Sequence, residues 1–276
     1  MYAQLNDTQL FFERVGKGQP LLVMHGGLGL DRTYFRPWLD RLGQQVELVY
    51  YDHRGNGRST RPATMEGITH ETWAADADAL RARLGFDKII LFGHSYGSFL
   101  AQEYALRFRN HLKGLILSNT APVFDYVPVI QANAAARGTP DALVALGEVF
   151  GRAMSDDDDW RSHWTRILPL YFRRFDPRIG KTMDEATSYS AAAWNHVNAN
   201  CLPKFNTLAR LKEIAVPALV LAGGDDWITP AEQNRRVHAE LPNAEFAIFE
   251  ASGHFPFIEE ADKFVTTVGN WIAKLG

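Results

Sequence analysis

The sequence predicts an α/β fold in which a mostly parallel sheet carries helices on both faces. Five short, nearly continuous apolar runs are typical of strands covered on both faces: residues 20–25, 46–52, 88–92, 112–118 and 218–222. Segments with the apolar spacing of helices lie between these runs, notably 33–42, 71–84 and 98–108. Strands that alternate with helices in this way favour a mainly parallel sheet.

The two ends of the chain complete the predicted sheet. Residues 4–6 and 9–15 flank an Asn-Asp pair and predict an antiparallel hairpin at the sheet edge. Near the other end, residues 245–249 predict the last strand, and residues 257–275 predict a closing helix.

An insert interrupts the alternation of strands and helices. The pattern stops after Asn119-Thr120-Ala121-Pro122 and resumes near Val216-Pro217, with helical candidates at 140–154, 156–171 and 182–200 between them. A helical insert at the carboxyl ends of the strands would cover the crevice where open α/β sheets bind ligands. We therefore predict a core of residues 1–121 and 208–276 and a helical cap, or lid, of residues 122–207.

The bulk composition indicates which classes of binding partner to expect. A length of 276 residues suits one α/β domain with an insert, and a formal net charge of -3 favours neither nucleic acid nor an anionic membrane as a partner. The sequence has no basic stretch leading into an apolar segment at its start and no apolar run long enough for a bilayer, so we expect a cytoplasmic protein. The single cysteine, Cys201, excludes an internal disulfide and a thiolate metal cluster.

The strongest chemical signal is the Gly-His-Ser-Tyr-Gly motif of residues 93–97, which lies between an apolar strand and a helical run. A serine on a sharp strand-to-helix turn needs little side-chain bulk two positions before and after it, and Gly93 and Gly97 meet that need. The helix that follows directs N–H groups toward an oxyanion formed at the serine. We therefore predict Ser95 as the nucleophile.

A serine hydroxyl needs a base within hydrogen-bonding reach, and that base needs a group that orients it. In this architecture the acid and then the histidine follow the serine along the chain. His254 lies in a loop directly after the last predicted strand and is the predicted general base, whereas His238 falls within a helical pattern.

The acid is expected after the strand 218–222, where Asp225 and Asp226 are both available. Either aspartate could cap the helix that follows. However, Thr229, Pro230 and Glu232 together resemble a helix start with its own capping hydroxyl, which leaves both aspartates free for another role.

Two main-chain N–H groups are expected to form an oxyanion hole. One comes from the residue after the nucleophile, Tyr96, and the other from the loop after an early strand. Residues 25–29 (HGGLG) follow such a strand, and Gly27 is the predicted second donor. A phosphate-binding loop is the alternative, but the glycine-rich segment has neither the lysine nor the glycine spacing of such loops.

Five motifs in this order resemble those of the α/β-hydrolases, and within that family the proline-iminopeptidase-like branch. They are residues 25–29 (HGGLG), 52–59 (DHRGNGRS), 93–97 (GHSYG), the set Gly223, Asp226 and Pro230, and 252–256 (SGHFP). The resemblance implies an α/β-hydrolase fold with an eight-stranded sheet, a helical cap after the sixth strand, and an acyl-enzyme mechanism without metal or cofactor. It also favours Asp226 over Asp225 as the acid.

The chain departs from the iminopeptidase pattern at two places. Leu28 stands where proline is common, and the insert has no recognisable glutamate motif of the kind that holds a substrate's free amine. The insert is instead rich in aromatic residues that suit an apolar pocket: Phe124, Tyr126, Phe150, Trp160, Trp164, Tyr171, Phe172, Tyr189 and Trp194.

These observations favour a serine hydrolase whose partner is a small-molecule ester or lactone. The alternatives are an aminopeptidase that releases an N-terminal proline or another small residue, and a binding protein that has lost turnover. The sequence leaves the oligomeric state open, a homo-oligomer included.

Overall fold

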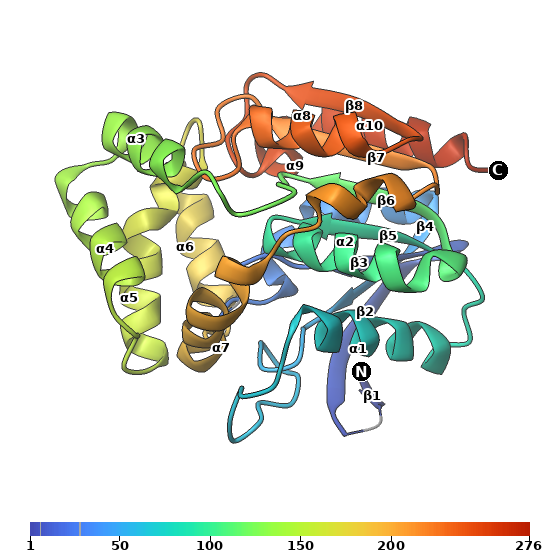
Figure 1. The fold of residues 1–276 in the computed structure, drawn as a ribbon, viewed down its shortest axis with the longest axis horizontal. Coiled ribbons are helices and arrows are strands. Elements are labelled where there is room, and N and C mark those ends of the chain that lie inside the picture. Colours follow the sequence, from blue (N-terminus) through green and yellow to red (C-terminus); the bar gives the residue numbers. More distant parts are fainter. Residues whose placement is uncertain (6, 28) are drawn as a thin grey trace.

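An eight-stranded sheet runs through the computed structural model, which describes residues 1–5, 7–27 and 29–276 (Figure 1). The strand order is β1-β2-β4-β3-β5-β6-β7-β8; β2 pairs antiparallel with β1 and β4, and all other pairs are parallel. The strands are β1 (Tyr2–Gln4), β2 (Gln9–Gly16), β3 (Gln19–Met24), β4 (Val46–Tyr51), β5 (Ile89–His94), β6 (Leu112–Ser118), β7 (Ala218–Gly223) and β8 (Ala244–Phe249). The predicted mostly parallel sheet and the hairpin at its edge are confirmed, while Asn6 in the hairpin turn lies outside the described residues.

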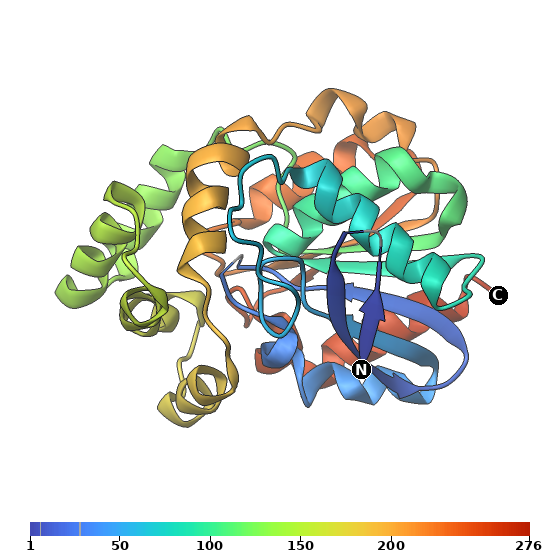
Figure 2. The same ribbon diagram turned by 90° about the horizontal axis from the view of Figure 1, so that it is seen from below.

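Helices cover both faces of the sheet. Figure 2 shows α1 and α2 on one side and α10 on the other. The helices of this part of the chain are α1 (His70–Arg83), α2 (Tyr96–Phe108), α8 (Ala231–Glu240), α9 (Pro256–Glu259) and α10 (Ala261–Ala273). Within the described ranges, no helix combines the length and the apolar character that crossing a lipid bilayer requires.

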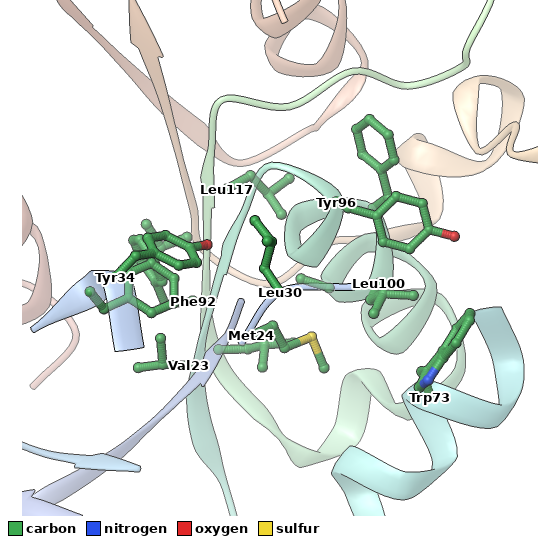
Figure 3. Close-up of a cluster of buried hydrophobic side chains, with 14 of the residues drawn as sticks. Val23, Met24, Leu30, Tyr34, Trp73, Phe92, Tyr96, Leu100 and Leu117 are labelled. Atoms are coloured by element: carbon green, nitrogen blue, oxygen red, sulfur yellow. The ribbon is translucent and has the colours of Figure 1, made fainter. Parts of the chain in front are cut away.

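The central strands are buried on both faces, which explains their continuous apolar sequences. Figure 3 shows part of the resulting core, with Val23 and Met24 from β3, Phe92 from β5, Leu100 from α2 and Leu117 from β6. Full burial of a side chain of this size stabilises the fold by about 1.5–3 kcal/mol. The carboxyl ends of β3, β5, β7 and β8, where the predicted site residues lie, therefore rest on a rigid support.

One predicted helix is wrong. Residues 33–42 do not form a continuous α-helix; two short 3-10 helices, Arg32–Phe35 and Trp38–Gln44, take its place. Arg36 between them is extended, with φ -100° and ψ 143°. The reason is Pro37, which has no N–H to donate and disfavours the helical conformation of the residue before it.

The segment between β6 and β7 contributes five helices at one end of the sheet (Figures 1 and 2). They are α3 (Val127–Arg137), α4 (Pro140–Gly151), α5 (Asp157–Ile167), α6 (Pro177–Ala186) and α7 (Ala191–His196). Thr207 N donates to Pro122 O over 2.8 Å, and Val123 forms a β-bridge with Asn206. The two ends of the segment thus lie together, and the division into a core and a cap at residues 122 and 207 stays a prediction.

Two details within the insert differ from expectation. The helix α3 was not predicted, and the helix predicted at 182–200 is divided into α6 and α7. The division falls before Ser190, whose hydroxyl accepts a hydrogen bond from Ala193 N and so starts a new helix.

A buried ion pair holds the loop after β3 against the end of β4. The Asp52 carboxylate is fully buried and accepts hydrogen bonds from one terminal nitrogen of Arg32 at 3.0 and 2.8 Å and from Arg58 N at 2.9 Å. The Arg32 guanidinium also donates to Glu13 of β2 at 2.8 and 3.0 Å. The loop that carries Gly27 is therefore tied to two strands.

We expect Arg32→Leu to lower the free energy of unfolding by about 3–5 kcal/mol, because it leaves the Asp52 carboxylate buried without its counter-ion. Urea unfolding followed by tryptophan fluorescence measures the effect. The matched control is Arg36→Leu, since the Arg36 side chain is 39% exposed and its pair with Asp40 should contribute about 0–1 kcal/mol. Equal effects of the two substitutions would contradict the anchoring role of Asp52.

Candidate active site

Ser95 lies on the turn between β5 and α2, as the sequence predicts. Its backbone has φ 55° and ψ -127°, a conformation that a residue with a side chain adopts only under constraint. Ser95 N donates to Ser118 O of β6 over 2.9 Å, so the neighbouring strand holds the turn. The side chain stays half-buried at the carboxyl end of the sheet.

Glycines allow the turn and the loop after β3 to approach each other. A Cβ atom at Gly97 would lie 2.3 Å from Met24 O, and one at Gly26 would lie 2.6 Å from the Cβ of Ser95. Neither contact can exist between real atoms, so both positions require glycine. The loop of residues 25–27 therefore lies directly against Ser95.

His254 follows β8 and forms a buried pair with Asp226. Its Nδ1 lies 2.7 Å from Asp226 Oδ2, and its main-chain N donates to Tyr171 O over 2.6 Å. Since the carboxylate accepts from Nδ1, the neutral ring presents Nε2 as an acceptor. Ser95 and His254 line the same pocket.

Several donors hold the Asp226 carboxylate. Asn119 Nδ2 and Thr229 Oγ1 donate to Oδ2 over 2.8 and 2.6 Å, and the N–H groups of Ile228 and Thr229 donate to Oδ1 over 3.0 and 3.1 Å. Burial by itself would raise the pKa of Asp226, but the electrostatic interaction with His254 and the hydrogen bonds from His254, Thr229 and Asn119 together hold that pKa well below its ordinary value. The carboxylate stays ionised at neutral pH.

Asp225 is placed differently. Its side chain is 46% exposed, and its carboxylate lies 3.9 Å from Arg137 and 3.7 Å from Arg173. The structure thus brings Asp226, and not Asp225, to His254.

The sequence argument about the helix start was wrong in one respect. The N-cap residue of α8 is Pro230, and no side chain caps this helix; the Thr229 hydroxyl donates to Asp226. Thr229 therefore holds the Asp226 carboxylate directly by a hydrogen bond.

The two predicted oxyanion donors lie on either side of Ser95. Tyr96 is the first residue of α2, and Gly27, with φ 50°, follows the glycine that touches Ser95. In residues 1–5, 7–27 and 29–276, no acceptor engages the N–H of Tyr96 or of Gly27. This geometry is compatible with the predicted oxyanion hole.

The pocket above Ser95 is closed by aromatic side chains of the insert. Five of the nine aromatic residues that the sequence singled out line it: Phe150, Trp160, Trp164, Tyr171 and Trp194. Leu30, Val149, Ile167 and Met183 add aliphatic surface, and none of the described residues that line the pocket is Asp, Glu, Lys or Arg. The pocket is suited to an apolar group.

Sequence reasoning missed Asn119, Tyr34 and His94. Asn119 accepts from Ser118 Oγ and donates to Asp226, and it adopts a positive φ of 55° directly after β6. A polar residue at the carboxyl end of a buried strand was the available signal. No comparable signal marked Tyr34 and His94, because their side chains come into contact only in the folded chain.

Similarity to known proteins identifies the fold family of the chain. A family model described as the alpha/beta hydrolase fold matches residues 19–261. The chain therefore belongs to the α/β-hydrolase fold family and is a hydrolase.

Its sequence is proline-iminopeptidase-like. It is 29% identical to the proline iminopeptidase PfmaB of Pestalotiopsis fici, with 99% of each chain covered, and 25% identical to a proline iminopeptidase of Clostridium botulinum, with 95% and 92% covered.

Solved structures share the fold over nearly the whole chain. An esterase from Exiguobacterium antarcticum has a TM-score of 0.81 at 23% identity, with 99% of this chain and 98% of the esterase covered. The enol-lactonase from Burkholderia xenovorans LB400 has a TM-score of 0.77 at 22% identity, with 99% and 100% covered.

We expect Asp226→Asn to lower kcat for ester hydrolysis by about 10³–10⁴-fold, because an amide in place of the carboxylate favours the wrong tautomer of His254. The control, Asp225→Asn, should keep kcat within about twofold, since that side chain faces solvent and two arginines. Steady-state kinetics on a nitrophenyl ester measure both variants. A larger loss at Asp225 would reverse the assignment.

Proposed function

We propose that this chain is a serine hydrolase that cleaves small to medium carboxylic esters or lactones through an acyl-enzyme on Ser95. The observation that carries the proposal is the pocket shared by Ser95 and His254, whose described lining is mostly aromatic and aliphatic, with Thr187 and His94 among its polar members and no Asp, Glu, Lys or Arg. Such a lining favours an apolar acyl or alcohol group.

The proposed reaction has two steps. His254 Nε2 takes the proton of the Ser95 hydroxyl as its oxygen attacks the ester carbonyl, and the N–H groups of Tyr96 and Gly27 stabilise the oxyanion. The C–O bond to the alcohol then breaks, and His254 returns the proton to the leaving oxygen. In the second step water attacks the acyl-enzyme by the same route and releases the acid and Ser95, while Asp226 stabilises the imidazolium throughout.

The alternative is release of an N-terminal residue, as the names of the sequence relatives suggest. A protonated free amine needs acidic partners in the pocket. Two carboxylates of the insert are paired and do not line the pocket: Glu148 with His163, and Asp184 with Arg161. Leu28, the other departure from the iminopeptidase pattern, lies outside the described residues. Only the acidic groups therefore count against an aminopeptidase here.

A binding protein without turnover is the third reading. Loss of turnover usually accompanies loss of a nucleophile or base, whereas Ser95, His254 and Asp226 are all present and the last two are hydrogen-bonded. This completeness supports a catalytic role.

The test is a substrate panel of short nitrophenyl esters, a γ-lactone and prolyl-naphthylamide, with Ser95→Ala as control. We expect ester or lactone kcat/KM to exceed that of the prolyl amide, and Ser95→Ala to lose at least about 10³-fold, because no other group supplies the nucleophile. A fluorophosphonate probe should label the wild type but not the variant. A strong preference for the prolyl amide would favour the aminopeptidase, and full activity of Ser95→Ala would exclude the nucleophile.

The apolar pocket makes a second prediction about chain length. Met183 of α6 lines the pocket, so Met183→Ala should enlarge it. The ratio of kcat/KM for an octanoate ester to kcat/KM for a butyrate ester should then rise by about tenfold, because each additional buried methylene contributes ~0.8 kcal/mol. Met154→Ala is the control, because Met154 is a buried methionine of the insert that does not line this pocket. An unchanged ratio in Met183→Ala would contradict the placement of the acyl group.

A further inference from the structure

A short series of buried hydrogen bonds joins the loop after β3 to the residue of the predicted base. Gly26 N lies 2.7 Å from Tyr34 Oη, Tyr34 Oη lies 2.9 Å from His94 Nδ1, and His94 Nε2 lies 2.8 Å from His254 O. The series therefore includes three parts of the site: the loop that carries Gly27, His94 directly before Ser95, and His254.

Each bond in this series has a definite direction. A carbonyl oxygen can only accept, so His94 Nε2 carries the proton and donates to His254 O. Nδ1 of the neutral ring is then an acceptor, and the Tyr34 hydroxyl donates to it. The hydroxyl oxygen in turn accepts from Gly26 N–H. A single arrangement of hydrogens satisfies every group.

The surroundings keep this arrangement in place. Tyr34 and His94 are buried, and the Tyr34 ring packs against Phe255 and Phe257 with centroid distances of 5.8 and 6.1 Å. Burial lowers the pKa of His94 well below its ordinary value, so the ring stays neutral and Nδ1 remains an acceptor. Figure 3 shows Tyr34 within the buried cluster.

The bond to Gly26 is one of several restraints on this glycine-rich segment, in which His25 Nδ1 also lies 2.9 Å from Gly26 O. Residues 26 and 27 are both glycine, and Gly27 has a positive φ of 50°. The Tyr34 hydroxyl fixes the peptide before Gly26, and Leu30 N fixes Gly27 O over 2.7 Å. The N–H of Gly27 lies between these two restraints.

We propose that Tyr34 and His94 are positioning residues that hold the Gly27 oxyanion donor and the His254 base in register around Ser95. The proposal rests on the proposed hydrolase function and deepens it. Neither side chain takes a proton from the substrate; both act through the groups that they hold.

The experiment compares Tyr34→Phe with Tyr50→Phe, using kcat and KM for a nitrophenyl ester and the inhibition constant of an alkylboronic acid. The Tyr50 hydroxyl is an apt control because Tyr50 is also buried and its hydroxyl donates to Asp40 over 3.0 Å, away from Ser95. A boronate bound to Ser95 places an oxygen in the oxyanion hole and so reports on Gly27.

We expect Tyr34→Phe to lower kcat and boronate affinity by about 10–100-fold and to keep KM within about threefold. A displaced Gly27 N–H would bind the oxyanion less well, and this loss affects the transition state more than the bound substrate. Tyr50→Phe should change none of these by more than about twofold. If Tyr34→Phe matches Tyr50→Phe in all three, the residue is only structural and the proposal is overturned.

A second variant keeps the proposal testable if Tyr34→Phe does not fold. His94→Phe keeps a ring of similar size but can neither donate to His254 O nor accept from Tyr34 Oη, so the same losses of kcat and boronate affinity are expected. Retention of both within about twofold would overturn the proposal. Ser95→Ala separates the two hypotheses: an active Ser95→Ala refutes the hydrolase mechanism, whereas unaltered Tyr34→Phe and His94→Phe refute only the positioning.

Discussion

The strained turn at Ser95 is the constraint on which the rest of the site depends. A positive φ between β5 and α2 is tolerated because Ser95 N is bonded to β6 and because glycines let the loop after β3 pass within contact distance. The same turn begins α2, so the first N–H of the helix, which we propose as an oxyanion donor, lies directly after Ser95. The close packing of the parallel strands β3, β5 and β6 holds this strained turn in place.

The buried pair of His254 and Asp226 completes the arrangement from the other half of the sheet. The paired carboxylate remains charged because four hydrogen-bond donors and the imidazole offset the cost of its burial. The Tyr34 and His94 hydrogen bonds link this half to the loop of Gly27. The loop of Gly27, the residue before Ser95, and His254 thus share one series of hydrogen bonds.

The insert contributes a different kind of chemistry. Its helices bring tryptophan, tyrosine and phenylalanine side chains to the pocket, while three of its carboxylates, Glu148, Asp159 and Asp184, pair with arginine or histidine side chains that do not line the pocket. The core thus supplies the proposed catalytic groups, and the insert shapes what they can act on. Family membership by itself leaves the substrate open, because one fold hosts many chemistries.

The sequence by itself determined the order of strands and helices, the turn at Ser95 and the place of His254, because these follow from local patterns of apolar residues, glycines and turns. Only the tertiary structure placed Asp226, and not Asp225, beside His254, and only it revealed Asn119, Tyr34 and His94 as partners. The breaks in the predicted helices at Pro37 and before Ser190 follow from local signals, a proline and a capping serine. Asn119 and Asp226 are 107 positions apart, and His94 and His254 are 160 apart. Contacts at such separations leave no periodic signal, because they arise only when parallel strands bring their carboxyl ends to one edge.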